Sequence, residues 1–343
     1  MSIRVLLVDD SPLMRTILRD MLKSEEGIEV VGVACDGMEG VRMANQLKPD
    51  VITMDVEMPK KDGLSALREI MRTCPTPVIM VSTLTSKGTS ATIEALSSGA
   101  VDFVCKPNNG AIREFRSIHD ELVAKIRGAA GAKVQSATVA PIRSSLPRHG
   151  SDNVIVIASS TGGPRSLASL WEQWPSGLQC PILIVQHMPA GFTASLANRL
   201  NNLGTVPCFE AKPGDVVTKG VAYLAPGGKH MRVGPNGALI FDEEPTIHGV
   251  RPAADHLFQT AVQRYGSKCV GIVLTGMGKD GAAGAKAIKD AGGVVFGESE
   301  QTCTVYGMPR AAAELDAVYA ECPIYELGHV VMATMSRRNQ HAS

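Results

Sequence analysis

The strongest constraint on this chain is a repeated alternation of short apolar runs with segments whose apolar residues recur at helical spacing. In the first part of the chain the two patterns alternate five times. Such an alternation predicts a doubly wound α/β fold, a five-stranded parallel sheet with helices on both faces, because each helix returns the chain to the edge where the next strand starts. The expected strands are Ile3–Val8, Glu29–Val33, Val51–Met54, Val78–Val81 and Val101–Cys105.

After residue 150 the alternation returns with longer connections. The Asn-Gly pair in MRVGPNGALIF, from Met231 to Phe241, lies between apolar runs and predicts a β-hairpin. The other expected strands are Val154–Ala158, Ile182–Val185, Val221–Ala225, Val270–Leu274 and Gly293–Phe296. The expected helices are Pro164–Trp174, Thr193–Asn202, Ala253–Arg264, Ala282–Ala291 and Leu327–Met335. This part is therefore expected to be a larger α/β domain with a mostly parallel sheet and a hairpin appendage.

A segment rich in Ala, Gly, Ser and Pro separates the two parts. Residues 128–150 show no periodicity and contain no acidic side chain, which is typical of a flexible linker. A length of 343 residues also fits two domains at about 150 residues each. We expect one domain at residues 1–127 and a second at 151–343, joined by a linker at 128–150.

Charge and cysteine usage exclude several classes of protein. Residues 1–128 carry 16 basic and 18 acidic side chains, and residues 151–343 carry 15 and 16, so neither domain has the basic excess of a nucleic-acid binder. The eight cysteines are scattered without a C-x-x-C pair, which is typical of reduced cytosolic thiols. No apolar run approaches the ~18 residues that span a bilayer, and the first is too short for a signal peptide. We expect a cytoplasmic protein without membrane insertion.

Chemically versatile side chains follow four of the strands expected in the first domain. These residues are Asp9 and Asp10, Asp55, Ser82 and Lys106. An open parallel sheet binds its ligands at the carboxyl ends of its strands. Three carboxylates there would repel one another unless a cation lay among them, and hard oxygen ligands suit Mg²⁺. A carboxylate can also attack phosphorus to form an acyl phosphate, which Lys106 would pair with and Ser82 would hydrogen-bond.

Each of these residues alone has a simpler explanation. Aspartate after a strand often caps the next helix, and a single Lys-Pro usually lies in a solvated turn. The combination of acid, acid, hydroxyl and lysine at successive strand ends favours a site.

With the motifs VLLVDDS, MDVEMP-x-x-DG, VSTLT and FVCKP, the first domain resembles the receiver domain of two-component response regulators, over roughly its first 125 residues. The resemblance implies a flavodoxin-like fold and phosphorylation of Asp55 by a histidine kinase. The implied Mg²⁺ ligands are Asp10, Asp55 and the main-chain carbonyl of Glu57, with Asp9 helping through water. The implied switch hydroxyl and paired lysine are Ser82 and Lys106. Thr83 adjoins Ser82, and Ser82 is preferred because it stands at the strand end.

In the second domain, a serine stands on a predicted tight turn. VIVIASSTGGP runs from a strand through small residues to Pro164, which is favoured in the first turn of a helix. A nucleophile elbow needs small residues two before and two after its serine. The window centred on Ser160 meets that need with Ala158 and Gly162, whereas the window centred on Ser159 does not. The free N–H groups of the following helix would stabilise an oxyanion beside Ser160.

Two further residues complete a candidate triad. LIVQHMP places His187 just past the next strand, and histidine is the side chain best matched to proton transfer near neutral pH. VLTGMGKDG places Asp280 in a Gly-rich loop after another strand. Serine, histidine and aspartate at three strand ends can form a triad in any chain order.

Simpler interpretations exist here too. STGG before a helix is at least as often a phosphate cradle as an elbow, and GMGKDG resembles a phosphate loop but lacks its spacing. His187 alone would be a surface or core residue, which is our interpretation of His230, His248 and His256.

The second domain contains five distinctive motifs, which are IASSTGGP, QHMPAGFTASLANRLN, YLAPGGKHM, LTGMGKDGAAGAKAIKDAGG and VYGMPRAA. Through these motifs, most of Val154 to Met335 resembles the catalytic domain of the chemotaxis methylesterases of the CheB family. The resemblance implies Ser160 as nucleophile, His187 as base and Asp280 as the orienting acid. Thr161 and Met277 match positions that line the active site of the family. This chain departs from the family pattern in having alanine at position 158, where the family commonly has glycine.

Together the resemblances imply a phosphorylation-activated hydrolase. Its implied substrates are glutamate γ-methyl esters on the cytoplasmic helices of methyl-accepting chemotaxis receptors, and it would also deamidate receptor glutamines. A chemotaxis histidine kinase would be the phosphodonor, and the ester chemistry would need no cofactor. The unphosphorylated receiver is expected to cover the active-site face, and phosphorylation of Asp55 to let the domains separate.

Other outputs remain open. A DNA-binding output would need a basic recognition helix, which the slightly acidic second domain does not show. A nucleotide-binding module would use STGG and GMGKDG as phosphate cradles. An esterase serving another sensory array is a third possibility.

Overall fold

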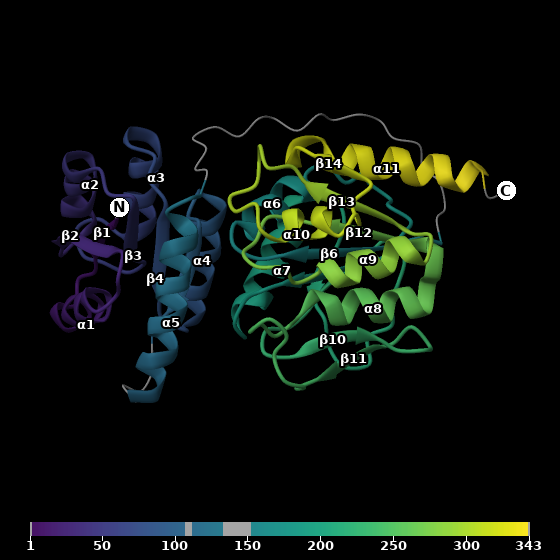
Figure 1. Cartoon of the computed structure of the whole chain (residues 1–343), viewed down its shortest axis with the longest axis horizontal. Coiled ribbons are helices and arrows are strands. Elements are labelled where there is room, and N and C mark those ends of the chain that lie inside the picture. Colours follow the sequence, from purple (N-terminus) through teal and green to yellow (C-terminus); the bar gives the residue numbers. More distant parts are fainter. Residues whose placement is uncertain (1, 107–111, 133–151, 342–343) are drawn as a thin grey trace. The chain divides into compact units, whose positions relative to one another are not determined.

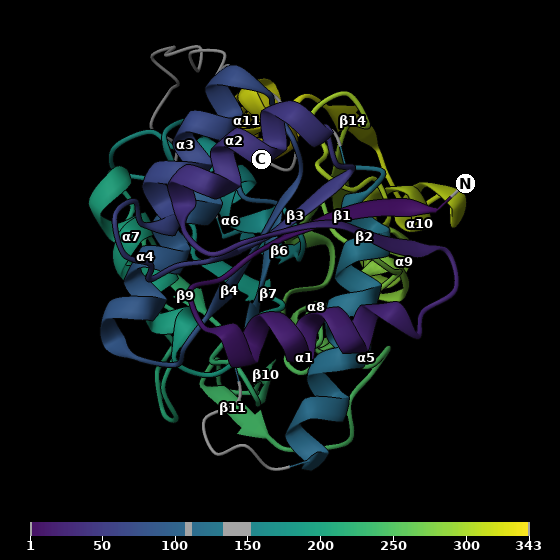
Figure 2. The same cartoon turned by 90° about the vertical axis from the view of Figure 1, so that its left-hand side faces the viewer.

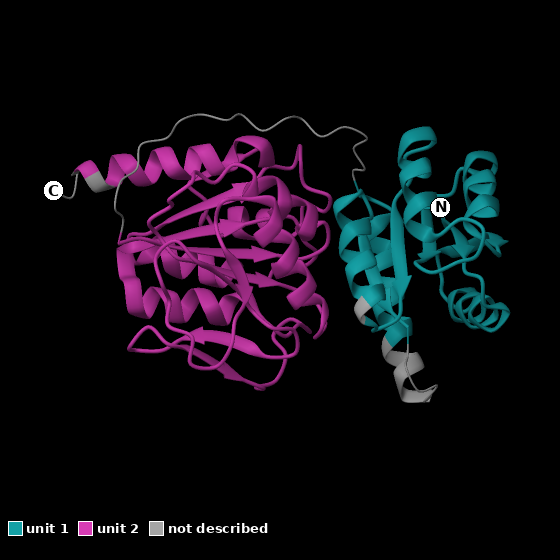
Figure 3. Cartoon of the chain, turned by 180° about the vertical axis from the view of Figure 1, so that it is seen from behind, with its two compact units in different colours: residues 1–138 teal, residues 139–343 magenta. Residues whose placement is uncertain are grey.

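The computed structural model describes residues 2–106, 112–132 and 152–341, and the chain divides into two compact units, Met1–Thr138 and Val139–Ser343 (Figure 3). The first unit ends with a long helix, α5 (Ile112–Ala129). The helix extends two residues into the segment 128–150, for which the sequence predicts a linker. Ala129, the last helical residue, is fully buried with Ile126 in the core of the first unit, which favours continuation of the helix. Residues 133–150 of the predicted linker lie outside the described residues.

The first unit is a doubly wound sheet, as predicted (Figure 2). Its strands are β1 (Ile3–Val8), β2 (Ile28–Ala34), β3 (Val51–Asp55), β4 (Val78–Ser82) and β5 (Asp102–Cys105). Its other helices are α1 (Pro12–Lys23), α2 (Gly37–Leu47), α3 (Gly63–Thr73) and α4 (Ser86–Ser97). All pairings are parallel in the order β2-β1-β3-β4-β5, the flavodoxin-like order whose ligands bind beside β1 and β3.

Local sequence explains where the first four helices begin. Ser11, Asp36, Asp62 and Thr85 each precede a helix, and each side chain accepts a hydrogen bond from a backbone N–H of the first turn. Such capping satisfies donors that have no partner within the helix. α1 and α5 then bury apolar side chains against one face of the sheet, with α2, α3 and α4 on the other (Figure 2).

The second unit is built on a larger parallel sheet (Figure 1). Its strands are β6 (Val154–Ser159), β7 (Ile182–Gln186), β8 (Cys208–Glu210), β9 (Ala222–Leu224), β12 (Cys269–Val273), β13 (Val294–Glu298) and β14 (Ala320–Cys322). They lie in the order β14-β13-β12-β6-β7-β9-β8. The chain therefore proceeds from β6 to one side and returns to β12 on the other, so the switch point at which α/β sheets bind ligands lies between β6 and β12.

Helices cover both faces of this sheet. They are α6 (Gly163–Trp171), α7 (Phe192–Leu203), α8 (Ala254–Tyr265), α9 (Ala282–Asp290), α10 (Met308–Glu314) and α11 (Ile324–His341), with a short 3₁₀ turn at Gly266–Lys268. α8, α9 and α10 pack on one face through a core that includes Phe258, Ile288 and Met308. The predicted hairpin is present as β10 (His230–Val233) and β11 (Leu239–Asp242), a separate antiparallel pair beside α8 (Figure 1).

β8, β14 and α10 are present in the structure but were not predicted from the sequence. The two strands are only three residues long and lie at the two edges of the sheet, so neither produces a visible alternation. Among the described residues, no helix is both long enough and apolar enough to cross a bilayer.

Candidate active site and candidate phosphorylation site

Ser160 and His187 lie at the same edge of two neighbouring strands. The last register pair of β6 and β7 is Ser159 with Gln186, and Ser160 and His187 each follow one residue later. The His187 N–H donates to the carbonyl of Ser159, the last residue of β6, at 3.0 Å, which extends the pairing one residue past the end of β7. Ser159 is fully buried, whereas Ser160 is partly exposed, which agrees with the choice of Ser160 as the candidate nucleophile.

The turn after Ser160 is tightly constrained. The Ser160 N–H donates to the carbonyl of Thr275, just past β12, at 3.0 Å. Gly162 has φ of +79°, a left-handed conformation, and a Cβ there would lie 2.4 Å from the hydroxyl oxygen of Thr304. α6 begins at Gly163 with proline in its first turn, as predicted. The turn thus places Ser160 beside the N-terminal end of a helix.

His187 and Asp280 are hydrogen-bonded. Nε2 of His187 lies 2.7 Å from Oδ2 of Asp280, and the two side chains are 9% and 2% exposed. Because Nε2 faces the carboxylate, Nδ1 is the ring nitrogen left to act on another group. The loop after β12 therefore brings Asp280 to the imidazole that follows β7.

The N-terminus of α8 holds Asp280 from the other side. The N–H of Ala254 donates to Oδ2 at 2.6 Å, and that of Asp255 donates to Oδ1 at 3.1 Å. Burial of Asp280 opposes its ionisation, but the hydrogen bonds from His187 and α8 hold its pKa below the ordinary value of 3.8. The residue before α8, Ala253, has no side-chain acceptor, so Asp280 supplies the cap of this helix.

Gln186 joins the backbone of the two candidate catalytic residues. Its Nε2 lies 2.9 Å from the Ser160 carbonyl and 3.2 Å from that of His187. Its Oε1 accepts from the Ser159 hydroxyl at 2.7 Å. Gln186 is 2% exposed, so these bonds form in a dry environment. The sequence analysis missed this residue, although it directly precedes His187.

Beneath the serine turn lies a second group that the sequence analysis missed. The Thr275 hydroxyl donates to the Thr161 carbonyl at 3.0 Å, and its N–H donates to the buried carboxylate of Glu298 at 3.0 Å. The Ser166 hydroxyl of α6 contacts the same carboxylate at 3.2 Å. Burial raises the pKa of Glu298, and these donors oppose the rise. The group ties β12, β13 and α6 together under Ser160.

The two predicted lining residues differ in exposure. Thr161 is 6% exposed, and its carbonyl is held by Thr275. Met277 is half-buried in the loop between Gly276 and Asp280. A Cβ on Gly276 would lie 2.7 Å from the Cβ of Ser160, so this loop passes directly over the serine.

In the first unit, three predicted carboxylates converge. Asp9, Asp10 and Asp55 each present an oxygen within 4.8 Å of the others. Asp9 and Asp55 are buried and Asp10 is exposed, so the cluster opens toward solvent on one side. The cap of α1 is Ser11, which leaves the two neighbouring aspartates for other contacts.

Lys106 contacts two of the three carboxylates. Its Nζ lies 2.6 Å from Oδ2 of Asp55 and 2.9 Å from Oδ2 of Asp9. Burial raises the pKa of Asp55 to about 6, the hydrogen bond and charge of Lys106 oppose that rise, and the charge of Asp9 adds to it. A further cation would therefore favour ionisation of this cluster.

The candidate switch residue Ser82 and the loop that carries Glu57 lie at the ends of β4 and β3, the strands next to this cluster. Ser82 ends β4 and is fully buried, with its hydroxyl 3.4 Å from the Gly88 carbonyl. The N–H of Glu57 donates to Oδ1 of Asp55 at 3.4 Å. A pocket of about 410 Å³ opens beside this loop and is lined by Asp10, Val56, Glu57, Met58, Asp62, Leu64, Lys87 and Ala91.

These residues fit Mg²⁺. The donors are hard carboxylate oxygens, which this ion prefers. The buried Oδ2 of Asp9 has the Lys106 ammonium 2.9 Å away, and the exposed Asp10 adds a third carboxylate to the cluster. An additional cation near Asp9, Asp10 and Asp55 would complete the charge balance.

Comparisons with known proteins agree with the two units. The family model described as CheB methylesterase matches residues 155–331, and the response regulator receiver domain model matches residues 5–114. The protein-glutamate methylesterase/protein-glutamine glutaminase of Pyrococcus abyssi is 43% identical, with 96% of this chain and 93% of that protein covered. The protein of the same name from Thermotoga maritima is 45% identical, with 95% and 96% covered.

A solved structure shows the same fold for the second unit. The crystal structure of the Thermotoga maritima CheB methylesterase catalytic domain matches with a TM-score of 0.52 and 40% sequence identity, covering 54% of this chain and 99% of that chain. The relatives match nearly the full length, and the family models account for both units. The chain therefore belongs to the CheB methylesterase family, as a hydrolase whose catalytic domain follows a response regulator receiver domain.

Proposed function

We propose that this protein is a phosphorylation-activated protein-glutamate methylesterase with additional protein-glutamine glutaminase activity. Its substrates are methyl-accepting chemotaxis receptors in the cytoplasm, and its phosphodonor is a chemotaxis histidine kinase. The single observation that carries the proposal is the 2.7 Å bond between His187 and the buried Asp280, at the sheet edge where Ser160 follows β6.

The hydrogen bond between Asp280 and His187 supports a mechanism for the ester chemistry. Asp280 accepts from Nε2–H of His187 and so leaves Nδ1 free to take the Ser160 proton. The serine oxygen attacks the γ-carbonyl carbon and forms a new C–O bond. The bond to the methoxy group then breaks, and the His187 proton leaves with it as methanol. Water hydrolyses the resulting acyl-enzyme by the same steps and releases glutamate. With a glutamine substrate, the leaving group is ammonia.

The developing oxyanion needs donors near Ser160. α6 starts three residues after the serine, and the free N–H groups of a helix N-terminus attract negative charge. The buried Thr275 and Gln186 hold the backbone of the turn at fixed distances. We propose that backbone N–H groups of this turn stabilise the oxyanion.

The receiver would control the esterase through Asp55. The carboxylate of Asp55 attacks the phosphorus of the phosphohistidine and forms an acyl phosphate, and the histidine leaves. Asp10, Asp55 and the Glu57 carbonyl would hold Mg²⁺, with Asp9 acting through water, and the bound ion would offset the charge of the phosphoryl oxygens. Lys106 already pairs with Asp55 and is placed to pair with the phosphoryl group, and Ser82 is the candidate switch hydroxyl.

The test is methanol release from methylated receptor membranes, with and without a small phosphodonor. We expect activity to rise with phosphorylation in the wild type, and Ser160→Ala to abolish methanol release while Asp55 is still phosphorylated. Ser169→Ala changes another serine, on α6, and should behave as the wild type. A nucleotide-binding output would instead leave the wild type without methanol release. Release only from esters of unrelated proteins would contradict the receptor substrate.

A further inference from the structure

The three N–H groups at the start of α8 are all bound by side chains from elsewhere in the fold. Those of Ala254 and Asp255 donate to Asp280. The one before them, on Ala253, donates to Nδ1 of His230 at 3.1 Å. Because Ala253 cannot cap the helix itself, its position depends on His230.

His230 is the first residue of β10 and is fully buried. Its Nε2 lies 3.2 Å from the carbonyl oxygen of Pro245. A carbonyl can only accept and a backbone N–H can only donate, so the proton must be on Nε2 and Nδ1 must be bare. The two contacts therefore fix a neutral imidazole in one tautomer and one orientation.

We propose that His230 is a positioning residue for the esterase. It accepts the Ala253 N–H, and the following two N–H groups of α8 orient the carboxylate of Asp280 toward His187. The proposal rests on the proposed function of the triad, but the chain of bonds from His230 to His187 is independent of any substrate. A small displacement of a catalytic group can lower a rate strongly, because the reacting atoms must be aligned.

The competing explanation is that the His230 ring only fills space. The ring packs edge-on against His256 of α8, with centroids 4.4 Å apart. If packing alone mattered, activity would depend on the volume of the ring and not on hydrogen bonding by its Nδ1 atom. The two explanations therefore differ in which substitutions they tolerate.

Two substitutions of similar polarity separate them. Asparagine places its amide oxygen near the position of Nδ1 and can still accept from Ala253, whereas glutamine reaches the position of Nε2 and faces Pro245. We expect His230→Gln to lower kcat by roughly 10- to 100-fold with KM unchanged, and His230→Asn to retain kcat within about threefold of the wild type. His256→Gln removes the packing partner and should retain activity. Thermal unfolding of each variant verifies that it folds.

A spectroscopic measurement makes the test independent of turnover. The proton between His187 and Asp280 should give a strongly downfield NMR resonance, identified by its loss in Asp280→Asn. We expect this resonance to shift or broaden in His230→Gln and to persist in His230→Asn. The ¹⁵N shifts of His230 in the wild type should show a neutral ring with the proton on Nε2, which needs no variant at all.

The results that overturn the proposal are distinct from failure of the proposed function. Wild-type kcat and an unshifted resonance in His230→Gln would overturn it, as would equal losses in the asparagine and glutamine variants or a ring protonated on Nδ1. A wild type that releases no methanol would refute the esterase, while the resonance and the tautomer would still decide the role of His230.

Discussion

Asp280 accepts two hydrogen bonds from the first turn of α8 and lies 2.7 Å from His187, so a single carboxylate both caps a helix and orients an imidazole. A buried carboxylate is costly unless its charge is compensated. Here the compensation comes from donors on a separate helix, and the lowered pKa of Asp280 reflects it. The same logic applies to Asp55, whose pKa is raised to about 6 by burial because Lys106 and the Glu57 N–H offset the loss of water incompletely.

Replacement of Asp280 by asparagine should separate its charge from its shape. The amide can present an N–H to Nε2 of His187, which favours the wrong tautomer for a base. We expect kcat for methanol release to fall by about 10³- to 10⁴-fold with little change in KM. Steady-state kinetics with methylated receptors measures this. A loss of less than tenfold would show that Asp280 does not act on His187.

The lowered pKa of Asp280 also predicts that the effect of Asp280→Asn on the free energy of unfolding depends on pH. A carboxyl group whose folded pKa lies below its ordinary value stabilises the protein above that value and loses the contribution as the pH falls through the folded pKa. The difference in unfolding free energy between the wild type and Asp280→Asn should therefore be largest above pH 3.8 and shrink at lower pH. Denaturant titrations across this range test it, and a difference independent of pH would contradict it.

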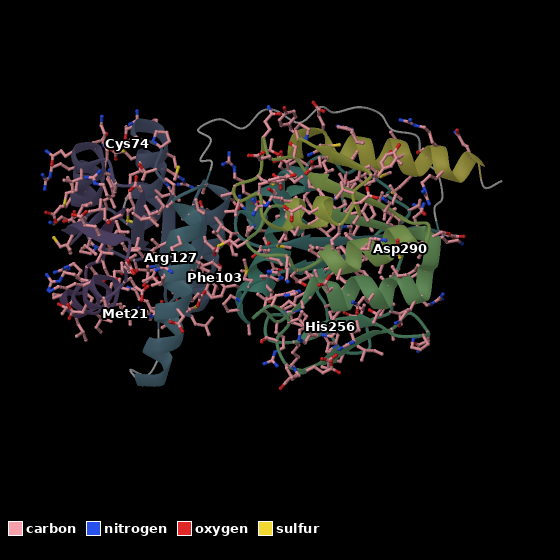
Figure 4. The ribbon with its side chains drawn as sticks, viewed as in Figure 1. Met21, Cys74, Phe103, Arg127, His256 and Asp290 are labelled. Carbon is pink, nitrogen blue, oxygen red and sulfur yellow. The ribbon has the colours of Figure 1, made fainter. Side chains whose placement is uncertain are left out.

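The control is an exposed carboxylate on a neighbouring helix. Asp290 is the exposed last residue of α9 (Figure 4), and it pairs with Lys286 on its own helix. Exposed ion pairs of this kind contribute little to stability. Asp290→Asn should therefore leave the unfolding free energy nearly unchanged at every pH.

Among the elements, the strand-to-helix connections at the carboxyl ends of β6, β7 and β12 build the esterase site. Parallel pairing brings these ends to one edge, so the motifs after each strand meet although they are far apart in the sequence. This is why the sequence could predict which residues lie there. Alternating apolar runs identify the strands, and strand ends in a parallel sheet have a fixed direction.

Other parts of the site give no local signal. Ala253 is not a capping residue, so nothing in the sequence indicates that α8 needs Asp280 and His230 as acceptors. Thr275 and Glu298 follow unremarkable strand patterns, and their role depends on contacts between β12 and β13. The sequence could thus predict which candidate residues share this sheet edge, but their supports arise from the tertiary packing of distant segments.

Gly162 provides a test of the serine turn. Alanine there combines left-handed strain with a contact of 2.4 Å to the Thr304 hydroxyl. Gly214 has φ of +89° with no atom within 4 Å of a Cβ, so Gly214→Ala isolates the strain alone. Strain of this kind costs roughly 1–2 kcal/mol. Gly162→Ala should lose more stability than Gly214→Ala and lower kcat at least about tenfold.

Denaturant unfolding and methanol release measure the two effects. Equal destabilisation by both substitutions, with full activity in Gly162→Ala, would show that the turn can shift without moving Ser160.

At the scale of the whole molecule, the chain combines two α/β units of different chemistry. The carboxylate cluster of the first suits phosphoryl transfer, and the serine turn of the second suits acyl transfer. Each candidate site is built from residues at the strand ends of its own sheet. The proposed regulation is that the receiver controls access to the esterase site.

This regulation makes a prediction about truncation. If the unphosphorylated receiver restrains the esterase, a chain lacking residues 1–150 should release methanol faster than the unphosphorylated whole chain. Allosteric couplings of 1–3 kcal/mol correspond to about 5- to 150-fold, so the increase should be measurable. The whole chain with a phosphodonor should approach the truncated form, while Asp55→Asn should remain at the basal rate with or without it. The restraint would be refuted if the truncated chain were no more active than the unphosphorylated whole chain. As a control, Ser160→Ala in the truncated chain measures the uncatalysed release of methanol.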